Sequence, residues 1–417
     1  SRFMNQVSDN VRKKVREKAK EKVREKNINH PLSIKTKVAA KLTSVSAYIN
    51  LAALRHNALI AQSIAPHSKL IAVIKANAYG HGIIDAAKAL STVAHGFAVA
   101  RINEALILRD NGFKQMIVVM SPALSSDALQ LCAKHQLTAV IHSDQNLDLE
   151  TLPPHLDYWL KVDSGMHRLG LSIESLNTVL ENIDSCSPAT TLMSHFSNAE
   201  RKDETSNQLQ MQCFKSALAQ RDGKADYQLS LSNSAALLRH NDAANYQQWQ
   251  SAQLDNYPIS SEYIRPGIML YGADPLEEAN AASQSLFPVM TLAAPILAIR
   301  TIKTGETVGY NGNWQAKRES VIATIGAGYG DGYPRHAPNG TPVIIHGQRV
   351  PLTGNVSMDT ISVDITDLIA QGINVEAGDN AELWGENLAA NEVAKLSETI
   401  AYELFTGISQ RVARILV

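Results

Sequence analysis

The strongest constraint on the fold is an alternation of short apolar runs with longer amphipathic segments that begins near residue 45. The runs are rich in β-branched residues and have the length of buried strands. We expect strands at Leu70–Lys75, Gly96–Ala100, Gln115–Met120, Thr138–His142, Asp157–Asp163, Thr190–Phe196, Tyr227–Asn233 and Tyr263–Tyr271. The segments between them show helical spacing, as in Asn103–Asp110, Ser125–His135, Ile173–Ile183 and Glu204–Ala219. Strands that are apolar along their whole length are typical of parallel sheets covered by crossover helices.

Strand–helix units of this kind favour a closed barrel. Eight of them over about 230 residues match the usual size of a (β/α)8 barrel. A doubly wound open sheet is the alternative, but no G-x-G-x-x-G motif follows the first strand. We therefore predict an α/β fold whose (β/α)8 barrel spans residues 44–285.

The pattern changes after about residue 285, where alternating residues and turn signals dominate. This pattern predicts a mostly-β second domain over residues 286–417 with one late helix, Asn391–Leu404. Its expected strands are Val289–Ile302, Thr307–Tyr310, Ser320–Ile325, Thr341–Ile345, Arg349–Pro351 and Ile361–Ile365.

Residues 1–43 form a basic extension with 13 Lys or Arg against 4 Asp or Glu, although the net charge of the whole chain is −1. Charges of both signs recur at helical spacing, so we expect a solvated helix or a disordered arm. A targeting peptide is disfavoured because the segment has no apolar core and contains Glu. No aromatic residues interleave the charges, so no nucleic-acid partner is expected. A side role of the arm at a nucleic acid or a membrane surface stays open.

Cysteine content and hydropathy bear on the compartment. The three cysteines, Cys132, Cys186 and Cys213, form no CxxC pair, which disfavours a disulfide scaffold or a cysteine-ligated metal site. The apolar stretch Val289–Ile299 has 11 residues and contains Pro295, so it is too short for a bilayer span. We expect a cytoplasmic enzyme with no resident metal.

Lys75 ends the first predicted barrel strand, at the carboxyl edge where barrel active sites lie. Partial burial lowers the pKa of a lysine there and makes the neutral amine available as a nucleophile. Position alone also fits a lysine that extends to solvent along the strand end.

The sequence around Lys75 resembles the pyridoxal-phosphate signature of the alanine racemases, a family with a barrel and a C-terminal β domain. The resemblance extends from about Ser46 to Arg414. It rests on motifs in the same order along the chain: Lys75–Gly82, Lys161–Gly170, Ser194–Glu200, Arg265–Gly272, Val308–Trp314, Gly328–Arg335 and Gly354–Asp359.

The resemblance implies a two-base racemisation. Lys75 would attach pyridoxal phosphate and move the Cα proton on one face of the substrate, and Tyr310 would serve the opposite face. Arg168 and His195 match residues that favour the tyrosine phenolate. Arg265 matches the arginine facing the pyridine nitrogen, where a permanent cation keeps that nitrogen unprotonated. In the family this tyrosine reaches the site of the other subunit, which implies a homodimer.

Further ligand contacts follow from the same resemblance. The cofactor phosphate is expected at the N–H groups of Gly267 and Ile268, the Ser234 hydroxyl and Tyr79. The substrate carboxylate is expected at Arg168 and the N–H of Met358. Supporting roles fall to Lys161, Tyr329 and Asp359. Lys161 matches a lysine that carries a carbamate in many members.

The chain departs from the family pattern at a few positions. Asn355 replaces a common arginine and Glu200 an aspartate, both in the substrate corridor with Tyr329 and Arg335. Gln410 stands where many members have tyrosine, so that phosphate contact is not transferred. The polar segment Asn241–Ser260 is longer than usual and is predicted to be a surface loop.

These observations favour an alanine racemase that supplies D-alanine for peptidoglycan. A racemase of broader amino-acid scope is the first alternative, because corridor changes could admit larger side chains. Decarboxylases of this fold usually have a catalytic cysteine in the β domain, whereas all three cysteines here precede it. A pyridoxal-phosphate carrier built on a lone barrel does not explain the second domain.

Overall fold

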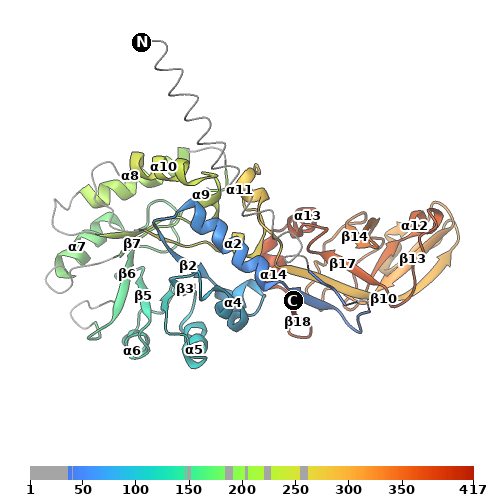
Figure 1. The fold of residues 1–417 in the computed structure, drawn as a ribbon, viewed down its shortest axis with the longest axis horizontal. Coiled ribbons are helices and arrows are strands. Elements are labelled where there is room, and N and C mark those ends of the chain that lie inside the picture. Colours follow the sequence, from blue (N-terminus) through green and yellow to red (C-terminus); the bar gives the residue numbers. More distant parts are fainter. Residues whose placement is uncertain are drawn as a thin grey trace, which may run out of the picture.

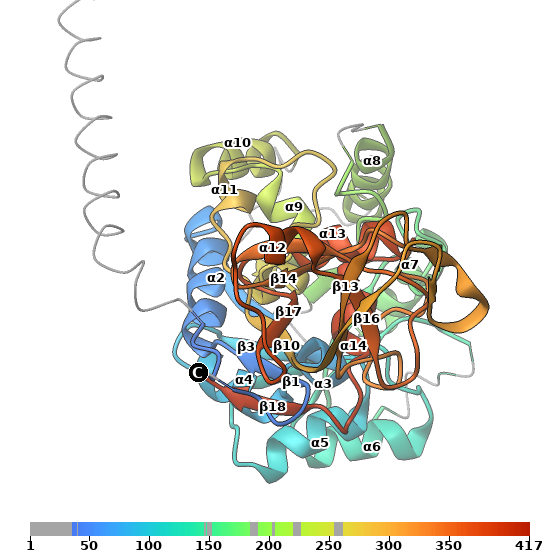
Figure 2. The ribbon, with the colours of Figure 1, turned by 90° about the vertical axis from the view of Figure 1, so that its right-hand side faces the viewer.

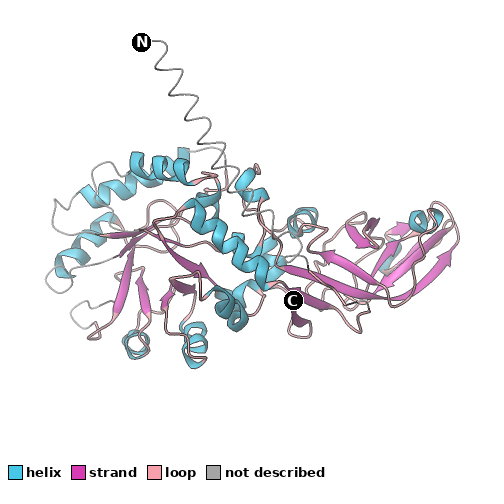
Figure 3. Cartoon of the chain, in the orientation of Figure 1, coloured by secondary structure: helices cyan, strands magenta, loops and turns pink. Residues whose placement is uncertain are grey.

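The structure is a computed structural model of the chain. It describes residues 36–39, 41–145, 147, 152–183, 191–201, 205–219, 227–253 and 262–417. Most of the basic extension and Cys186 therefore lie outside the described residues. Two bodies lie end to end along the long axis, a helix-covered barrel and a β-rich domain, as Figure 1 and Figure 3 show.

The first body is an eight-stranded parallel sheet that is nearly closed, which confirms the predicted (β/α)8 barrel. Its strand order is β8-β7-β6-β5-β4-β3-β2-β9. Two isolated parallel bridges, Leu229 with Glu262 and Asn233 with Arg265, connect the two ends of this path. The strands are β2 (Lys69–Val73), β3 (Gly96–Val99), β4 (Met116–Val119), β5 (Thr138–Ile141), β6 (Asp157–Lys161), β7 (Thr191–Met193), β8 (Gln228–Ser230) and β9 (Tyr263–Ile264).

Helices surround this sheet. They are α4 (Ile83–Leu90), α5 (Ile102–Asp110), α6 (Ser126–Lys134), α7 (Ile173–Ile183), α8 (Thr205–Ala219), α9 (Ser234–Leu238) and α10 (Ala243–Gln253). The helix α2 (Leu51–Ile64) precedes the first barrel strand and packs against α4 and α10, so it takes the eighth helical position. Its first turn is capped by Asn50, whose Oδ1 accepts the N–H of Ala53 at 3.0 Å. The β5–β6 connection contains no helix among its described residues.

The second body is a β-rich domain, again as predicted. Its main sheet has the order β15-β14-β17-β10-β1-β18, and β13 and β16 extend from β10. The strands are β10 (Met290–Ile302), β13 (Ser320–Ile325), β14 (Pro342–Ile345), β15 (Gln348–Pro351), β16 (Ile361–Asp364), β17 (Asn380–Trp384) and β18 (Ala413–Leu416). A separate hairpin pairs β11 (Thr307–Val308) with β12 (Trp314–Gln315). Figure 2 views this domain with the barrel behind it.

The chain crosses between the bodies more than once. Strand β1 (Ser46–Ile49) precedes the barrel in sequence but pairs antiparallel with β10 and parallel with β18. The guanidinium of Arg414 on β18 donates to the carbonyl of Gly80, which follows the first barrel strand. These contacts fix the C-terminal domain at the edge of the barrel that carries Lys75. The predicted boundary at residue 285 stays a prediction, and β1 lies on the other side of it in space.

Three local predictions are wrong. The expected late helix, Asn391–Leu404, is two helices, α13 (Ala390–Leu396) and α14 (Ala401–Thr406), because the chain turns at Glu398, where φ is 57°. The last barrel strand stops at Ile264 because Pro266 cannot extend a ladder, and η2 (Ile268–Tyr271) follows it. The described part of the expected loop Asn241–Ser260 forms α10, and residues 254–260 lie outside the described chain.

The helices described here are too short or too polar to cross a bilayer. The cytoplasmic location stays a prediction from the cysteine content.

Candidate active site at the barrel mouth

Lys75 lies directly after β2, at the carboxyl edge of the barrel, as predicted. The four residues that follow it form a left-handed turn, in which φ is 50° for Ala76, 55° for Asn77, 53° for Ala78 and 50° for Tyr79. This conformation costs about 1–2 kcal/mol for each residue that has a Cβ. Four consecutive residues of this kind therefore need strong tertiary support.

Side chains on both sides hold the turn. The N–H of Ala76 donates to Oε2 of Glu104 at 2.6 Å, and the N–H of Ile83 donates to Oδ1 of Asn77 at 2.9 Å. A Cβ on Gly80 would lie 2.0 Å from the carbonyl oxygen of Phe405 on α14. The C-terminal domain therefore packs against the turn at a point where only glycine fits.

Four cationic side chains and a histidine gather at this edge. Burial, and then the charge of Arg168, lower the pKa of Lys75. Burial, followed by the charges of Arg265 and Arg168, lowers the pKa of Lys161 to about 8. His195 follows β7, and burial with the neighbouring cations lowers its pKa to about 3, so its ring is neutral at pH 7. A site with this excess of positive charge suits an anionic ligand.

Arg265 follows β9 and is 3% exposed. Its guanidinium donates to Oγ of Ser230 and, at 2.8 Å, to the carbonyl of Ser194. Burial lowers its pKa to about 10, which the carboxylate of Glu262 opposes. The guanidinium remains charged at neutral pH and is fixed in the barrel interior.

The backbone of residues 267–269 lies beside Tyr79. The N–H groups of Gly267 and Met269 donate to Oγ of Ser234, at 2.8 and 3.2 Å. A Cβ on Gly267 would lie 2.5 Å from the Tyr79 hydroxyl, and the Tyr79 ring stacks on Tyr271 with centroids 4.6 Å apart. We call the hydroxyls of Ser234 and Tyr79 and the N–H groups of Gly267 and Met269 the Ser234 cup. This group suits a phosphate, because a phosphate accepts hydrogen bonds from several donors at once.

The predicted residues of the C-terminal domain form a second group. Tyr310, Tyr329 and Met358 are 71%, 43% and 52% exposed. The carbonyl of Tyr310 accepts the side-chain amide of Asn355 at 3.0 Å, and Asp359 accepts the guanidinium of Arg411 at 2.7 Å. In the described part of the chain, the hydrogen bonds found for Tyr310 stay within this domain. Among the described residues, electrostatic interactions therefore link Lys75, Lys161, Arg168, His195 and Arg265 with one another, and no interaction found there links them to Tyr310 of the same chain.

Comparison with known proteins decides the family. Residues 49–275 match the family described as "Alanine racemase, N-terminal domain", and residues 289–416 match "Alanine racemase, C-terminal domain". The chain belongs to the alanine racemase family. It is 44% identical to the alanine racemase of Chromohalobacter salexigens over 88% of this chain and 96% of that protein. It is 40% identical to that of Vibrio atlanticus over 89% of this chain and 99% of the relative.

Solved structures of alanine racemases share the whole architecture. The biosynthetic alanine racemase of Pseudomonas aeruginosa superposes with a TM-score of 0.79 at 36% identity, covering 90% of this chain and 100% of that one. The alanine racemase of Bartonella henselae, solved with covalently bound pyridoxal phosphate, has a TM-score of 0.75 at 30% identity, again over 90% and 100%. These matches confirm the predicted resemblance along nearly the whole chain.

Sequence reasoning missed two residues that shape this alanine racemase site. Glu104 caps α5 and holds the turn after Lys75, and Glu262 lies behind Arg265. Glu104 accepts the N–H groups of Ala100 and Arg101 at the start of α5, but Arg101 cannot accept a hydrogen bond in return, so the sequence contains no capping-box pattern that could have identified Glu104. Glu262 could be identified only from the structure, because a carboxylate three residues before an arginine is not a recognised sequence motif.

Proposed function

We propose that this chain is a pyridoxal-phosphate-dependent racemase that interconverts L- and D-alanine, as its relatives are named to do. The observation that carries the proposal is Lys75, held by a left-handed turn at the carboxyl edge of the barrel. Burial and Arg168 lower its pKa, which raises the fraction of neutral amine. In a bacterial cell the product would supply D-alanine for peptidoglycan.

The residues present fit pyridoxal phosphate. The missing Cβ of Gly267 leaves room beside the Tyr79 hydroxyl, and Ser234 brings a hydroxyl to the same place. We assign the phosphate to the Ser234 cup with the N–H of Ile268, and the pyridine ring to the space between Lys75, His195 and Arg265. When bound, the cofactor supplies an electron sink that lets a substrate Cα proton leave.

The protein's own groups then move the proton. The Lys75 amine takes or returns the Cα proton on one face of the substrate, and the Tyr310 hydroxyl serves the other. Arg265, fixed and charged, would face the pyridine nitrogen and would disfavour its protonation, because a second positive charge there would be repelled. Arg168 and the N–H of Met358 bind the substrate carboxylate. Tyr329 and Asp359 shape the approach to it.

A dimer completes the site. The Tyr310 side chain is exposed (71%), and its backbone carbonyl accepts the side-chain amide of Asn355 in the same β domain. We assign it to the active site of the partner in a head-to-tail homodimer. The active site of an isolated chain would then contain Lys75 but no second base.

Lys161 supports this arrangement from the end of β6. Its pKa of about 8 leaves a useful fraction of neutral amine, and Arg168 and Arg265 lie close enough to stabilise a negative charge there. A carbamate on Lys161 fits this environment, and intact-protein mass after mild trapping of carbon dioxide adducts tests it.

Subunit complementation tests the two-base dimer. Lys75→Ala and Tyr310→Phe should each abolish racemisation. Co-expressed, they should form mixed dimers with one intact site, which returns about a quarter of the normal activity for random pairing. If Tyr310 served its own chain, no mixed dimer would contain an intact site, and activity would stay absent.

Exchange of the Cα proton for deuterium over a panel of amino acids tests the reaction and its scope. If the enzyme is a narrow racemase, only alanine should exchange its Cα proton for deuterium, and it should keep its carboxyl group. Exchange of larger amino acids would favour the broader racemase, for which Asn355 and Glu200 in the corridor give a reason. Release of carbon dioxide without exchange would contradict the proposal.

A further inference from the structure

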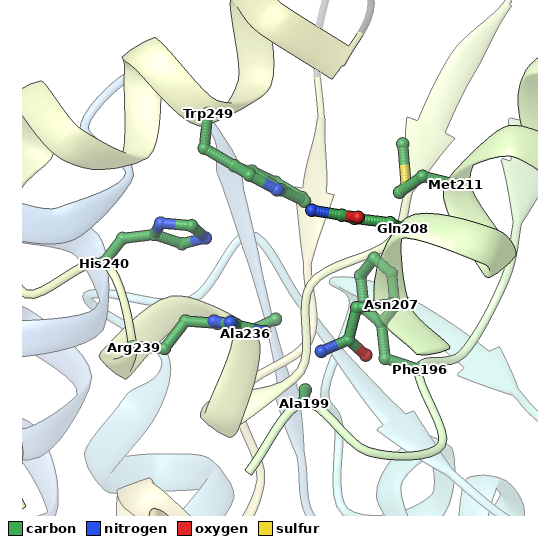
Figure 4. A pocket seen from close by; sticks show the side chains of 9 residues that line it. All are labelled: Phe196, Ala199, Asn207, Gln208, Met211, Ala236, Arg239, His240 and Trp249. Atoms are coloured by element: carbon green, nitrogen blue, oxygen red, sulfur yellow. The ribbon is translucent and has the colours of Figure 1, made fainter. Parts of the chain in front are cut away.

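The pocket between α8, α9 and α10 is too small for an organic ligand. Figure 4 shows the side chains that line it, and two of its rings already touch, since the centroids of Phe196 and Trp249 lie 6.2 Å apart. About 50 Å³ of space remains for a ligand, well below the size of small-molecule sites in proteins. A set of contacts in the C-terminal domain bears more directly on the reaction.

Two loops of this domain pack backbone to backbone. They are residues 328–332, here called the Tyr329 loop, and residues 354–359, here called the Met358 loop. The N–H of Tyr329 donates to the carbonyl of Ser357 at 3.0 Å, and the N–H of Gly330 donates to the carbonyl of Met358 at 2.8 Å. A Cβ on Gly328 would lie 2.3 Å from the carbonyl oxygen of Ser357. The loops therefore meet at a distance that only glycine permits.

This packing sets the direction of the Met358 N–H. In a planar trans peptide the carbonyl and the N–H point in opposite directions. Because the carbonyl of Ser357 is bonded to the Tyr329 loop, the N–H of Met358 in the same peptide points away from that loop. This N–H donates no hydrogen bond found in the described chain, and the Met358 side chain beside it is exposed. A fixed N–H of this kind can donate to a carboxylate.

Arg411 joins the two loops. Its Nε donates to Oδ1 of Asp331 at 2.6 Å, and its Nη2 donates to Oδ1 of Asp359 at 2.7 Å and to the carbonyl of Met358 at 3.4 Å. The carboxylate of Asp331 is buried, and its other oxygen accepts the N–H of Gly328 at 2.9 Å. The planar guanidinium has donors in fixed directions, so one side chain bonds to both loops at once.

The Met358 loop also contacts the segment that carries Tyr310. The side-chain amide of Asn355 donates to the carbonyl of Tyr310 at 3.0 Å, and a Cβ on Gly354 would lie 2.6 Å from the carbonyl oxygen of Val308. Met358 and Tyr310 therefore belong to one packed surface of the domain and serve the same active site. In the proposed dimer that site belongs to the partner.

We propose that Arg411 is a positioning residue for the substrate carboxylate. Together with Asp331 it fixes the peptide between Ser357 and Met358, so that the N–H of Met358 is held where the carboxylate binds in the partner's site. Arg411 itself does not touch the substrate. The inference rests on the function proposed above and extends it, since that function assigns no role to Arg411 or Asp331.

Two fragments of alanine separate the carboxylate contact from the rest of the site. Propionate keeps the carboxylate and lacks the amine, whereas ethylamine keeps the amine and lacks the carboxylate. In the full chain loaded with pyridoxal phosphate, Arg411→Met should weaken propionate about 10-fold in calorimetric titration, as expected when a hydrogen bond to a charged group is lost. Ethylamine, followed by the absorbance of the cofactor, should bind with unchanged affinity. Equal weakening of both fragments, or unchanged binding of propionate, would overturn the proposal.

A matched arginine on the same domain is the control. Arg349 donates to Glu392 at 2.9 Å and is about as exposed as Arg411, but it lies outside both loops. Arg349→Met should leave the binding of both fragments unchanged. Arg411→Lys can keep an ion pair with Asp331 and should fold even where Arg411→Met does not, but one ammonium group cannot reproduce the planar bridge to Asp359. It should weaken propionate in the same direction, and wild-type affinity in this variant would contradict the bridge.

Mixed dimers test whether Arg411 acts through Met358 of its own chain. When Lys75→Ala pairs with Tyr310→Phe, the single intact site takes Tyr310 from the Lys75→Ala chain. Arg411→Met on that chain should raise KM for alanine about 10-fold with a much smaller change in kcat, because a binding contact is lost. The same change on the Tyr310→Phe chain should leave KM unchanged.

An equal rise in KM from either chain would contradict the proposal. An inactive pair without the Arg411 change would instead overturn the proposed dimer, and the two fragments would still decide the role of Arg411.

Discussion

The Oε2 of Glu104 accepts the backbone N–H of Ala76 at 2.6 Å, one residue after Lys75. The same carboxylate accepts the N–H groups of Ala100 and Arg101 through Oε1, both at 2.9 Å. One side chain therefore connects the start of α5 to the turn that presents the reactive amine. It also places a negative charge near Lys75, which opposes the fall in the pKa of that lysine.

Replacement of this carboxylate should change the reactivity of Lys75. In Glu104→Gln the opposing charge is gone, so the pKa of Lys75 should fall further. The rate of trinitrophenylation of Lys75 in the cofactor-free protein, followed by peptide mapping against pH, measures this. Asp110→Asn, an exposed change at the end of the same helix, is the control. A reactivity midpoint that stays in place or moves upward would refute the electrostatic role.

The close approach of Gly267 to Tyr79 gives a second prediction. Gly267→Ala places a methyl group 2.5 Å from the Tyr79 hydroxyl, whose ring is fixed by Tyr271, so we expect a loss of about 1–3 kcal/mol in unfolding free energy. In a Tyr79→Phe background the nearest ring atom is 3.3 Å away, and the same change should cost much less. Urea unfolding of the four proteins measures this coupling. Additive losses would show that the clash lies elsewhere.

The sequence predicted the barrel because its buried strands are apolar on both faces, as Ile117–Val119 and Ala139–Ile141 are in the structure. The left-handed turn after Lys75 could not be predicted, since Ala76 and Ala78 prefer other conformations and the turn depends on Glu104 and Asn77. Strand β1 was missed for a similar reason. Four residues, Ser46–Ile49, carry too little pattern, and their partners lie more than 240 positions away on β10.

The candidate site likewise contains residues whose position the sequence predicted and residues whose position it did not. Lys75 and Arg265 stand at strand ends, where the pattern of the barrel already places them near each other. Glu262 and the left-handed turn belong to contacts between elements distant in sequence, which no local pattern records. The role of Tyr310 cannot be seen in the structure of one chain, because we assign it to the active site of the other subunit.

His81 should make the protein less stable in mild acid. It is 1% exposed, its Nδ1 bonds to the carbonyl of Tyr79 at 2.8 Å, and burial lowers its pKa from 6.5 to about 4. Because the folded pKa is depressed, its contribution is present above pH 6.5 and is lost as the pH falls toward 4, by about 3 kcal/mol in all.

Unfolding free energies at pH 7.5, 6.0 and 5.0 check this. His81→Asn keeps a donor for the Tyr79 carbonyl but cannot titrate, so its stability should fall less steeply between pH 6.5 and 5. His67→Asn, at an exposed position, should retain the slope of the wild type. Parallel slopes for His81→Asn and the wild type would assign the acid sensitivity to other groups.

Glu262 should stabilise the protein through the charge of Arg265. Its carboxylate is 3% exposed and accepts hydrogen bonds from Tyr246 at 2.5 Å, Gln250 at 2.6 Å and Ser232 at 3.0 Å. Glu262→Gln preserves the shape but leaves the buried guanidinium of Arg265 without this negative charge, so we expect a loss of about 2–4 kcal/mol.

A double-mutant cycle separates this charge effect from the loss of hydrogen bonds. Tyr246→Phe removes one donor to Glu262 and should cost about 1.5–3 kcal/mol whether or not Arg265 is present. Glu262→Gln should instead cost far less in an Arg265→Met background, because no buried cation then remains to be compensated. Urea unfolding of the single and double variants measures both couplings. If Glu262→Gln cost the same in both backgrounds, the carboxylate would act only as an anchor for α10, and the electrostatic support of Arg265 would have to come from another group.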